Sequence, residues 1–291
     1  MTQVTSSSHL YREVIAKLSA AGVANSTNEA AWLFEHAVGW TRLMIHTEPD
    51  RSLSVEDRQR VWECVERRMS GEPLQYIIGS QEFWGRDFMV TRNVLIPRPE
   101  TELLVQAVLS RLRNRPHPII VDVGTGSGCI AITVNLEIPE ATVFALDRCP
   151  SAIQIAQRNA HFHSQSDHLR FCVSDLLSPL LSGHLVGKVT AIVANLPYIR
   201  EEEFSTLSRE VSNFEPKMAL DGGPDGLSLY RRLLPEAATV LAPHGQMVVE
   251  VGQGQARLLC EEALSSGHYR ADETIRDSLG IERIVCLERR G

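Results

Sequence analysis

Starting at residue 119, short apolar runs alternate with stretches in which apolar residues recur at helical spacing. Short runs rich in Val, Ile and Leu are typical of buried strands. Because parallel strands need long connections, usually helices, this alternation predicts an α/β fold with a doubly wound, mostly parallel sheet. We predict strands over 119–123, 142–147, 169–175, 189–194, 246–251 and 283–287, and helices over 130–136, 152–160, 227–241 and 255–265.

The first predicted strand leads into a turn with glycine at every second position of 124–128. Glycines let the backbone approach a ligand closely, and in a doubly wound sheet this turn lies at the edge where ligands bind. A dinucleotide-binding turn has the pattern GxGxxG, whose third glycine would fall where this chain has Cys129. The turn therefore favours a nucleoside without a pyrophosphate and disfavours a dehydrogenase.

Acidic residues end the second and third predicted strands. Asp147 follows the glycine turn by roughly 20 residues, where a carboxylate can accept hydrogen bonds from ribose hydroxyls. Asp175 is followed by Leu176, so that a carboxylate can meet an adenine amino group while the leucine packs on the ring. Either acid alone is typical of an exposed strand end. Together, after a glycine turn, they predict a nucleoside site.

The fourth predicted strand ends in Asn195-Leu196-Pro197-Tyr198. The asparagine amide both donates and accepts hydrogen bonds, the proline stiffens the turn, and the tyrosine supplies a flat ring. Such a group can hold a planar nitrogen substrate by hydrogen bonding and stacking. The same residues suit an ordinary turn after a strand, so this stretch alone leaves both interpretations open.

The first 72 residues follow a different pattern. Apolar residues at helical spacing predict helices that begin near Leu10, Glu29 and Val55, with a shorter helical segment near Leu43. Ser54 is placed to cap the helix that begins at Val55. We predict a small helical domain over residues 1–72 that has a structural or partner-binding role.

Residues 73–96 are predicted to form a β-hairpin linker. Glycines separate three short segments there, over 76–79, 81–85 and 87–90, each of which we predict to be a β segment. Two prolines then bracket Arg98 and hold it at a fixed position. A helix is predicted over 103–112, and the α/β domain is placed over residues 97–291.

The charge balance narrows the function classes. The 291 residues include 29 Lys and Arg and 36 Asp and Glu, for a formal net charge of -7, which counts against a nucleic-acid backbone as the main partner. No apolar run approaches the ~20 residues of a membrane span, and we expect no signal peptide. The six cysteines form no CxxC pair and the histidines no metal-binding pattern, so we expect no metal and free thiols in a cytoplasmic protein.

Taken in order, these motifs resemble those of class I S-adenosylmethionine methyltransferases, and the Asn-x-Pro-Tyr element resembles that of enzymes acting on planar nitrogens. More narrowly, three further stretches are similar to the release factor glutamine methyltransferases (the PrmC/HemK family). They are Pro73–Gly79 with Glu82–Gly85, Ile96–Glu102, and Glu215-Pro216 with Ala219–Leu227. The resemblance covers nearly the whole chain; its middle motifs are specific, whereas the first 70 residues are not.

The resemblance implies an enzyme that uses S-adenosyl-L-methionine to methylate N5 of the glutamine in the Gly-Gly-Gln motif of class 1 peptide chain release factors. It implies that the helical domain docks the substrate, and we expect a monomer without a nucleic-acid or membrane partner. The implied catalytic residues are Asn195, Leu196, Pro197 and Tyr198. The implied cofactor-binding residues are Asp122, Gly124, Thr125, Gly126, Ser127, Gly128, Asp147, Asp175, Leu176 and Asn195.

The predicted mechanism must overcome the low nucleophilicity of an amide nitrogen, whose lone pair is delocalised into the carbonyl. The Asn195 side-chain oxygen and the Leu196 carbonyl would each accept one amide N–H and hold the nitrogen in line with the methyl group, while Tyr198 packs on the flat amide. The commoner family form has proline at position 196; leucine keeps the carbonyl, so we expect activity with a less rigid turn. No general base is evident, so the proton is expected to pass to water.

Two other functions are compatible with parts of this pattern. A DNA adenine-N6 methyltransferase would use the same Asn-x-Pro-Tyr chemistry, but the acidic balance and the lack of a basic target-recognition segment count against it. A non-catalytic S-adenosylmethionine-binding protein would not need the intact Asn195–Tyr198 stretch. The role of Arg98 is open between cofactor, substrate and domain junction, and we favour a structural role.

Overall fold

The computed structural model describes residues 6–163 and 167–291. The chain divides into two compact units, Met1–Ser80 with Ser208–Phe214, and Gln81–Leu207 with Glu215–Gly291. The first unit thus extends eight residues beyond the boundary expected at 72 and includes a short segment that we placed in the α/β domain. Residues 1–5, part of the N-terminus where we expect no signal peptide, lie outside the described residues.

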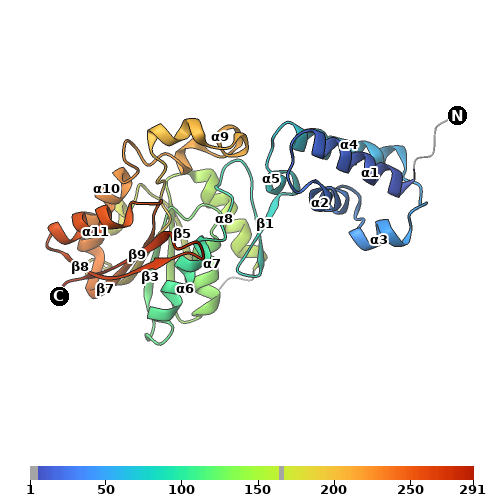
Figure 1. Ribbon diagram of the computed structural model, residues 1–291. Helices are drawn as coiled ribbons and strands as arrows, with labels where there is room; N and C mark the ends of the chain where they lie inside the picture. Colours follow the sequence, from blue (N-terminus) through green and yellow to red (C-terminus); the bar gives the residue numbers. More distant parts are fainter. Residues whose placement is uncertain (1–5, 164–166) are drawn as a thin grey trace. The chain divides into compact units, whose positions relative to one another are not determined.

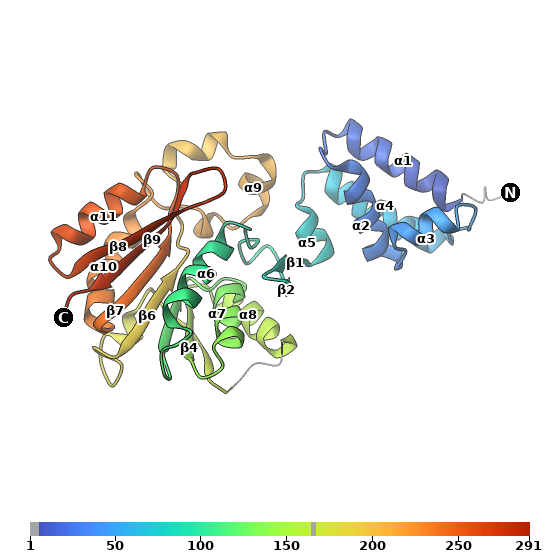
Figure 2. The same ribbon diagram turned by 60° about the horizontal axis from the view of Figure 1, so that its bottom comes forward.

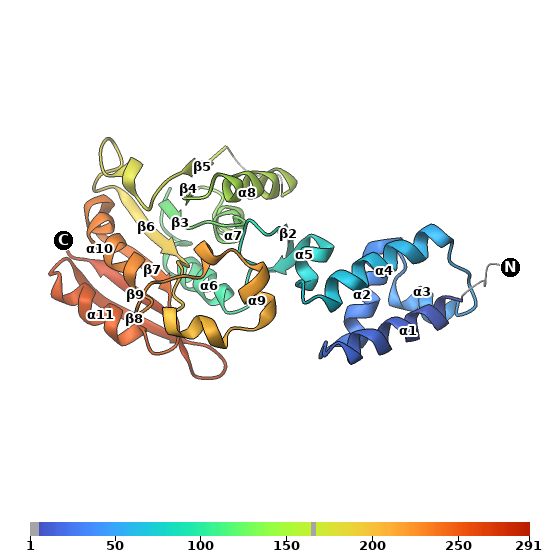
Figure 3. The same cartoon turned by 90° about the horizontal axis from the view of Figure 1, so that it is seen from above.

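The first unit is a bundle of helices around its own core. Its helices are α1 (Ser7–Ala20), α2 (Ser26–Val38), α3 (Arg42–Thr47), α4 (Val55–Met69), α5 (Leu74–Ile78) and α9 (Arg209–Phe214). Helices α1, α2 and α4 lie side by side (Figure 3) and bury apolar residues such as Leu10, Phe34 and Val65. The Ser54 side chain accepts a hydrogen bond from the Asp57 N–H at 3.0 Å, which confirms the predicted cap of α4.

The predicted β segment over 76–79 is wrong, because Leu74–Ile78 forms helix α5. Pro73, whose fixed φ suits a helix start, precedes it, and Gly79 ends it in the left-handed conformation with φ 82°. Leu74 and Ile77 pack into the helical core. A short apolar run does not distinguish strand from helix by periodicity, and here packing decides.

A buried arginine ties α9 to the rest of the first unit. Arg68 lies 2.5 Å (Nε) from Glu29 Oε2 and 2.6 Å (Nη2) from Glu210 Oε1, and it also donates to the Glu72 carbonyl. The Arg68 side chain is only 6% exposed, so these partners compensate the burial of its charge.

The second unit contains a seven-stranded sheet in the order β5-β4-β3-β6-β7-β9-β8. The strands are β3 (Ile119–Val123), β4 (Thr142–Asp147), β5 (Leu169–Val173), β6 (Val189–Ala194), β7 (Leu241–Glu250), β8 (Tyr269–Arg276) and β9 (Glu282–Arg289). Strands β3 to β7 run parallel, and β9 is antiparallel to both its neighbours. The predicted doubly wound, mostly parallel sheet is confirmed, and its strand order reverses between β3 and β6.

Strand β8 is absent from the predicted set. It pairs with β9 at the edge of the sheet, where both strands are coloured red in Figure 1. Only Tyr269 of its eight residues is buried, and four of the others are charged. Charged side chains protect an edge strand from further pairing, but they also remove the apolar pattern that would reveal it.

Helices cover both faces of the sheet (Figure 2). Apolar residues of α6 (Thr101–Leu112), α7 (Cys129–Glu137) and α8 (Pro150–Phe162) form one core, and those of α10 (Ser228–Val240) and α11 (Ala256–Ser265) belong to the other. Short 3-10 helices cover Ser178–Leu180, Glu201–Thr206 and Lys217–Ala219. No helix in the described part of the chain is long and apolar enough to cross a bilayer.

The β-hairpin formed by β1 (Ser80–Phe83) and β2 (Arg86–Met89) confirms two of the three predicted β segments. Its turn has positive φ at Trp84 and Gly85, as the twist of a two-residue hairpin favours. Phe83 and Phe88 are buried in the core with α6 and α7. The hairpin is therefore anchored on the α/β domain.

Candidate active site

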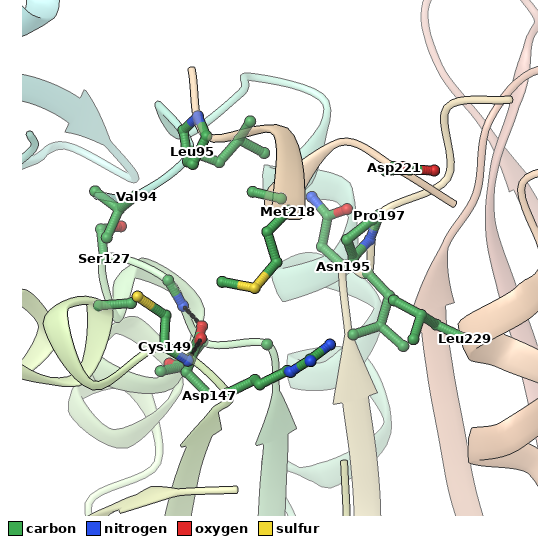
Figure 4. A pocket seen from close by; sticks show the side chains of 18 of the residues that line it. Val94, Leu95, Ser127, Asp147, Cys149, Asn195, Pro197, Met218, Asp221 and Leu229 are labelled. Carbon is green, nitrogen blue, oxygen red and sulfur yellow. Dashed lines mark hydrogen bonds between the residues drawn. The ribbon is translucent and has the colours of Figure 1, made fainter. Parts of the chain in front are cut away.

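A cavity of about 420 Å³ opens at the carboxyl ends of the parallel strands. It is lined by residues after β3, β4, β5 and β6, by 93–101 and by 216–229. Figure 4 shows Asp147 and Cys149 on one side and Asn195 and Pro197 on the other, with the Met218 side chain extending into the space. This is where the reversal of strand order places ligands in open α/β sheets.

The glycine turn after β3 lines the cavity with Gly124, Thr125, Gly126 and Ser127. Gly124 and Gly126 have φ of 77° and 55°, in the region that favours glycine. Gly128 does not line the cavity. A Cβ there would lie 2.9 Å from Ile132 Cδ1 and 3.0 Å from the Ala156 Cβ, so its role is to let α7 pack against α8.

Asp122 lies beneath this turn and outside the cavity lining. Its Oδ2 accepts a hydrogen bond of 2.7 Å from Thr125 Oγ1, and its Oδ1 has no hydrogen-bond partner among the described residues. Burial raises the pKa of Asp122 to about 7, with the Thr125 hydrogen bond opposing the shift. The structure thus connects Asp122 with the cavity through Thr125.

Asp147 lines the cavity at the end of β4. Its Oδ2 accepts from the Gly126 N–H at 2.9 Å and its Oδ1 from the Cys149 N–H at 2.8 Å, so one carboxylate joins two loops. Burial raises the pKa of Asp147, and the two backbone hydrogen bonds oppose this shift. A carboxylate has about four acceptor positions, so each oxygen retains capacity for a ligand hydroxyl.

Asp175 and Leu176 line the cavity after β5. Asp175 Oδ2 lies 2.7 Å from Arg232 Nη2, in an ion pair whose side chains are about half exposed. Leu176 is buried with φ 49°, and its carbonyl accepts a 2.6 Å hydrogen bond from Ser174 Oγ. The structure therefore brings both predicted adenine contacts to the cavity of Asp147.

Asn195 and Leu196 reach the cavity from the end of β6. Asn195 Nδ2 donates to Thr101 Oγ1 at 3.0 Å, and the Leu196 N–H donates to the Tyr230 hydroxyl at 3.2 Å. The Leu196 side chain is buried, with Cδ2 3.0 Å from where a Cβ on Gly124 would stand. Glycine at 124 thus gives Leu196 the room to pack beside the turn after β3.

Tyr198 is not among the residues that line the cavity. Its hydroxyl donates to Glu250 Oε1 at 3.4 Å, and its carbonyl accepts a 2.8 Å hydrogen bond from Gln255 Nε2. Burial is the main cause that raises the pKa of Tyr198, followed by the nearby Glu250 carboxyl. Pro197 does line the cavity, so of the four residues Asn195–Tyr198 the structure brings three to it.

Arg98 forms an ion pair with a buried glutamate. Its Nη2 lies 2.5 Å from Glu215 Oε1, and Glu215 Oε2 accepts from the Ile96 N–H at 3.4 Å. The residues after Glu215 include Pro216 and Met218, both of which line the cavity, as does Arg98. Arg98 therefore holds the loop that forms one wall of the cavity.

Sequence reasoning missed two buried polar residues at this site. Thr101 begins α6 and Glu250 ends β7, each at most 2% exposed. Glu250 is a carboxylate at the end of a predicted strand, the same signal that identified Asp147. Among residues 6–163 and 167–291, no group of three or more His, Cys, Asp or Glu side chains is arranged to hold a metal ion.

Comparisons with known proteins place this arrangement in a family. The family described as PrmC N-terminal domain matches residues 9–79, and the family described as methyltransferase small domain matches residues 99–211. The hMettl16 catalytic domain, solved in complex with MAT2A 3'UTR hairpin 6, has a similar fold, with a TM-score of 0.56 at 14% identity over 82% of this chain and 84% of that one.

Two relatives are similar over nearly their full length. The release factor glutamine methyltransferase of Moorella thermoacetica is 39% identical over 278 residues, covering 96% of each chain. That of Geobacter sulfurreducens is 39% identical over 269 residues, covering 92% of this chain and 91% of the relative. The chain therefore belongs to the release factor glutamine methyltransferase family, and it is a methyltransferase.

Proposed function

We propose that this enzyme transfers a methyl group from S-adenosyl-L-methionine to N5 of the glutamine in the Gly-Gly-Gln motif of class 1 peptide chain release factors. The observation that carries the proposal is the position of Asn195: its amide reaches the same cavity as the glycine turn and Asp147. A primary amide beside a nucleoside site is suited to holding another amide near the cofactor.

The residues of the cavity fit the cofactor. Gly124 and Gly126 have positive φ, which other residues adopt only with strain, and their lack of a side chain lets a ligand approach the backbone. Beside them, the Asp147 carboxylate can still accept hydrogen bonds from a ligand. Asp147 would hold the ribose, and Asp175 with Leu176 the adenine, while Asp122 and Gly128 act by supporting the turn. When bound, the cofactor supplies an electrophilic methyl group on a sulfonium.

The substrate amide would be held by two acceptors. Because Asn195 Nδ2 already donates to Thr101, its Oδ1 is the atom left to accept one substrate N–H. The Leu196 carbonyl would accept the other, and the two hydrogen bonds strengthen as positive charge develops on the nitrogen. Pro197 restricts the turn. Tyr198 would act through its hydrogen bonds with Glu250 and Gln255 behind the cavity lining, and the proton would pass to water.

The helical unit would dock the release factor. Trp32 and Leu43 are 47% and 71% exposed on this unit and supply apolar surface for such a contact. The net charge of -7 does not favour nucleic acid as a partner. The proposed enzyme would act as a monomer without nucleic-acid or membrane contact. Its place of action would be the cytoplasm, where release factors work.

A methyl-transfer assay tests the substrate. Labelled S-adenosyl-L-methionine is offered with a release factor, with the same factor carrying a Gln→Ala substitution in its Gly-Gly-Gln motif, and with duplex DNA. We expect label only in the unmodified factor. Equal label in both factors would refute the assigned acceptor, and label in DNA would favour adenine-N6 methylation.

Asn195→Ala tests the acceptor assignment. We expect kcat to fall about a hundredfold or more because one preorganised acceptor is lost, while the Kd of S-adenosyl-L-methionine changes less than about threefold. Asn114→Ala, at an exposed position after α6, is the matched control. Transfer by the Asn195 variant at a near wild-type rate would contradict the assignment.

A further inference from the structure

Three elements place buried polar groups behind the Asn195 amide. Thr101 is the first residue of α6, Asn195 follows β6, and Glu250 ends β7. Thr101 Oγ1 accepts from Asn195 Nδ2 at 3.0 Å. Burial raises the pKa of Glu250, and a hydrogen bond with the Thr101 side chain opposes this shift. The three side chains form a continuous polar contact that the roles assigned above leave unused.

The direction of these hydrogen bonds follows from chemistry. An ionised carboxyl only accepts hydrogen bonds, and a hydroxyl has a single hydrogen to donate. A threonine hydroxyl that gives its hydrogen to Glu250 has only lone pairs left for Asn195. It can therefore bind the donor end of the amide, Nδ2, but not its oxygen.

The orientation of the amide decides whether Asn195 can hold the substrate. With Nδ2 toward Thr101, Oδ1 is available to accept a substrate N–H. The opposite orientation would present an NH₂ group to the NH₂ of the substrate glutamine, and two donors repel. Nothing in asparagine itself selects one orientation, so the selection must come from its neighbours.

We propose that Thr101 and Glu250 are positioning residues that fix the orientation of the Asn195 amide, so that its oxygen faces the methyl acceptor. This inference rests on the proposed function, because it assumes that Asn195 binds the substrate amide. Thr101 lines the cavity and Glu250 does not, and both act through Asn195.

The surroundings of Glu250 suit this role. The Tyr198 hydroxyl after β6 donates to Oε1, the Tyr230 hydroxyl of α10 donates to the Glu250 carbonyl, and Oε2 has no hydrogen-bond partner among the described residues. The Arg283 charge of β9 favours ionisation, whereas the Glu100 charge beside α6 opposes it. The Cys129 thiol of α7 stays neutral, because burial raises its pKa to about 12.

Glu250 can also lose its charge near neutral pH. Burial raises its pKa to about 7, and protonation would let the carboxyl donate a hydrogen bond to Thr101. The threonine would then be free to donate to Asn195, and both amide orientations would be allowed.

The test compares Thr101→Val with Thr101→Ser. Valine keeps the shape of the side chain without the hydroxyl, and serine keeps the hydroxyl. We expect kcat to fall about tenfold in Thr101→Val, the worth of one neutral hydrogen bond, and to change less than about threefold in Thr101→Ser, with KM for both substrates nearly unchanged. Equal kcat values in the two variants would overturn the proposal, as would a loss in Thr101→Val that appears only in KM.

Glu250→Gln supplies a second readout. An amide both donates and accepts, so it does not enforce the direction of the Thr101 hydroxyl. We expect kcat of the wild type to rise with pH through about 7 as Glu250 ionises, and this step to be absent in Glu250→Gln. A step of unchanged size and midpoint in the variant would overturn the role of Glu250.

A measurement without catalysis separates this proposal from the proposed function. In ¹⁵N NMR spectra the Asn195 side-chain NH₂ pair is assigned by its loss in Asn195→Ala. We expect one protected N–H in the wild type and Thr101→Ser, and loss of that protection in Thr101→Val. If the wild type fails to methylate a release factor but the NMR result holds, the proposed substrate is wrong and the amide positioning stands. If protection is the same in all three proteins, the positioning proposal is wrong.

Discussion

Each end of the cavity has a buried threonine next to a buried carboxyl. The two pairs differ in how far apart their members lie in the sequence. At the proposed cofactor end, Thr125 of the glycine turn donates to Asp122, which lies three positions earlier in β3. At the proposed acceptor end, a hydrogen bond with Thr101 of α6 opposes the raised pKa of Glu250 in β7, which is far away in the sequence. The local pair fixes the shape of a backbone turn, whereas the remote pair would orient the side chain of Asn195.

The two ends of the cavity are therefore formed in different ways. At the proposed cofactor end, the Gly126 and Cys149 N–H groups donate to the Asp147 carboxylate, so the geometry follows from the glycine turn and from the position of Asp147 at the end of its strand. Side chains from three elements hold the acceptor end, so its geometry depends on the packing of α6, β6 and β7. Substitutions at the first pair should therefore change cofactor affinity, and those at the second should change turnover.

The largest expected effect is on stability, where the two carboxyls are predicted to behave alike. Burial raises the pKa of Asp122 and of Glu250 to about 7, well above their values in an unfolded chain. The folded protein thus binds more protons between about pH 4 and 7, so both groups lower the stability as pH rises through this window. Linkage gives a loss on the order of 3 kcal/mol for each fully buried group.

Urea unfolding at pH 5 to 8 measures this effect. We expect Asp122→Asn and Glu250→Gln each to reduce the decline in unfolding free energy with rising pH, relative to the wild type. Asn114→Ala, which replaces an exposed residue that does not titrate, should leave the pH dependence unchanged. If Asp122→Asn or Glu250→Gln showed the pH dependence of the wild type, the two carboxyls would not contribute alike to the pH dependence of stability.

Next in size is the loss of the carboxylate that joins the two loops of the cofactor end. Asp147→Ala leaves the N–H groups of Gly126 and Cys149 without their acceptor and removes the proposed ribose contact. Hydrogen bonds to a charged group contribute about 1.5–3 kcal/mol each, so we expect the Kd of S-adenosyl-L-methionine to rise about thirtyfold or more.

Calorimetry measures this Kd, and turnover at saturating cofactor supplies the contrast. We expect kcat of Asp147→Ala to stay within about threefold of the wild type, because the acceptor end is intact. A large fall in kcat at saturation would show that the two ends of the cavity do not act separately.

The sequence predicts the cofactor end better than the acceptor end, and the reason is physical. Asp147 and Asp175 stand directly after apolar strands, so adjacency in the sheet follows from the alternation alone. Thr101 carries no such signal, because its partners Asn195 and Glu250 become neighbours only when α6 packs across the strand ends. Glu250 is the second-last residue of the strand predicted over 246–251, but a carboxylate there gains a role only through that packing.

Packing also explains why strand β8 and helix α5 were not predicted. Local pattern identifies β3, β4 and β6, which lie in the middle of the sheet and are mostly buried and apolar. It also identifies the edge strand β5, in which four of five residues are apolar. It fails for β8, an edge strand with few buried residues, and for Leu74–Ile78, where a short apolar run packs as a helix. Tertiary packing, rather than local preference, decides these segments.

A smaller effect should separate the two threonines. Thr125→Val removes the hydrogen bond to Asp122 and leaves a buried carboxyl without its donor, so we expect the cofactor Kd to rise about tenfold with little change in kcat. Thr101→Val should instead lower kcat and change the cofactor Kd little. Thr125→Ser is the matched control, since it keeps the hydroxyl. If Thr101→Val weakened cofactor binding as much as Thr125→Val does, the distinction between the two pairs would fail.

The smallest effect is expected at the exposed edge of the cofactor end. Arg232 and Asp175 form an ion pair with both side chains about half exposed, and such pairs contribute on the order of 1 kcal/mol or less. Arg232 would also compete with the adenine amino group that is proposed to bind the Asp175 carboxylate. Arg232→Met should therefore change the cofactor Kd by no more than about threefold, toward tighter binding.

Measurements at several salt concentrations separate the effect of the Arg232–Asp175 ion pair from that of the buried hydrogen bonds. Screening by salt weakens an exposed ion pair but leaves buried hydrogen bonds nearly unchanged. Raising the salt concentration should bring the cofactor Kd of the wild type toward that of Arg232→Met, which itself should respond less. Weaker binding by Arg232→Met at all salt concentrations would mean that Arg232 supports Asp175 in the productive position. In that case an ion pair would stabilise the proposed cofactor end at its solvent-exposed rim, as the Arg98–Glu215 ion pair does for the loop that includes Pro216 and Met218.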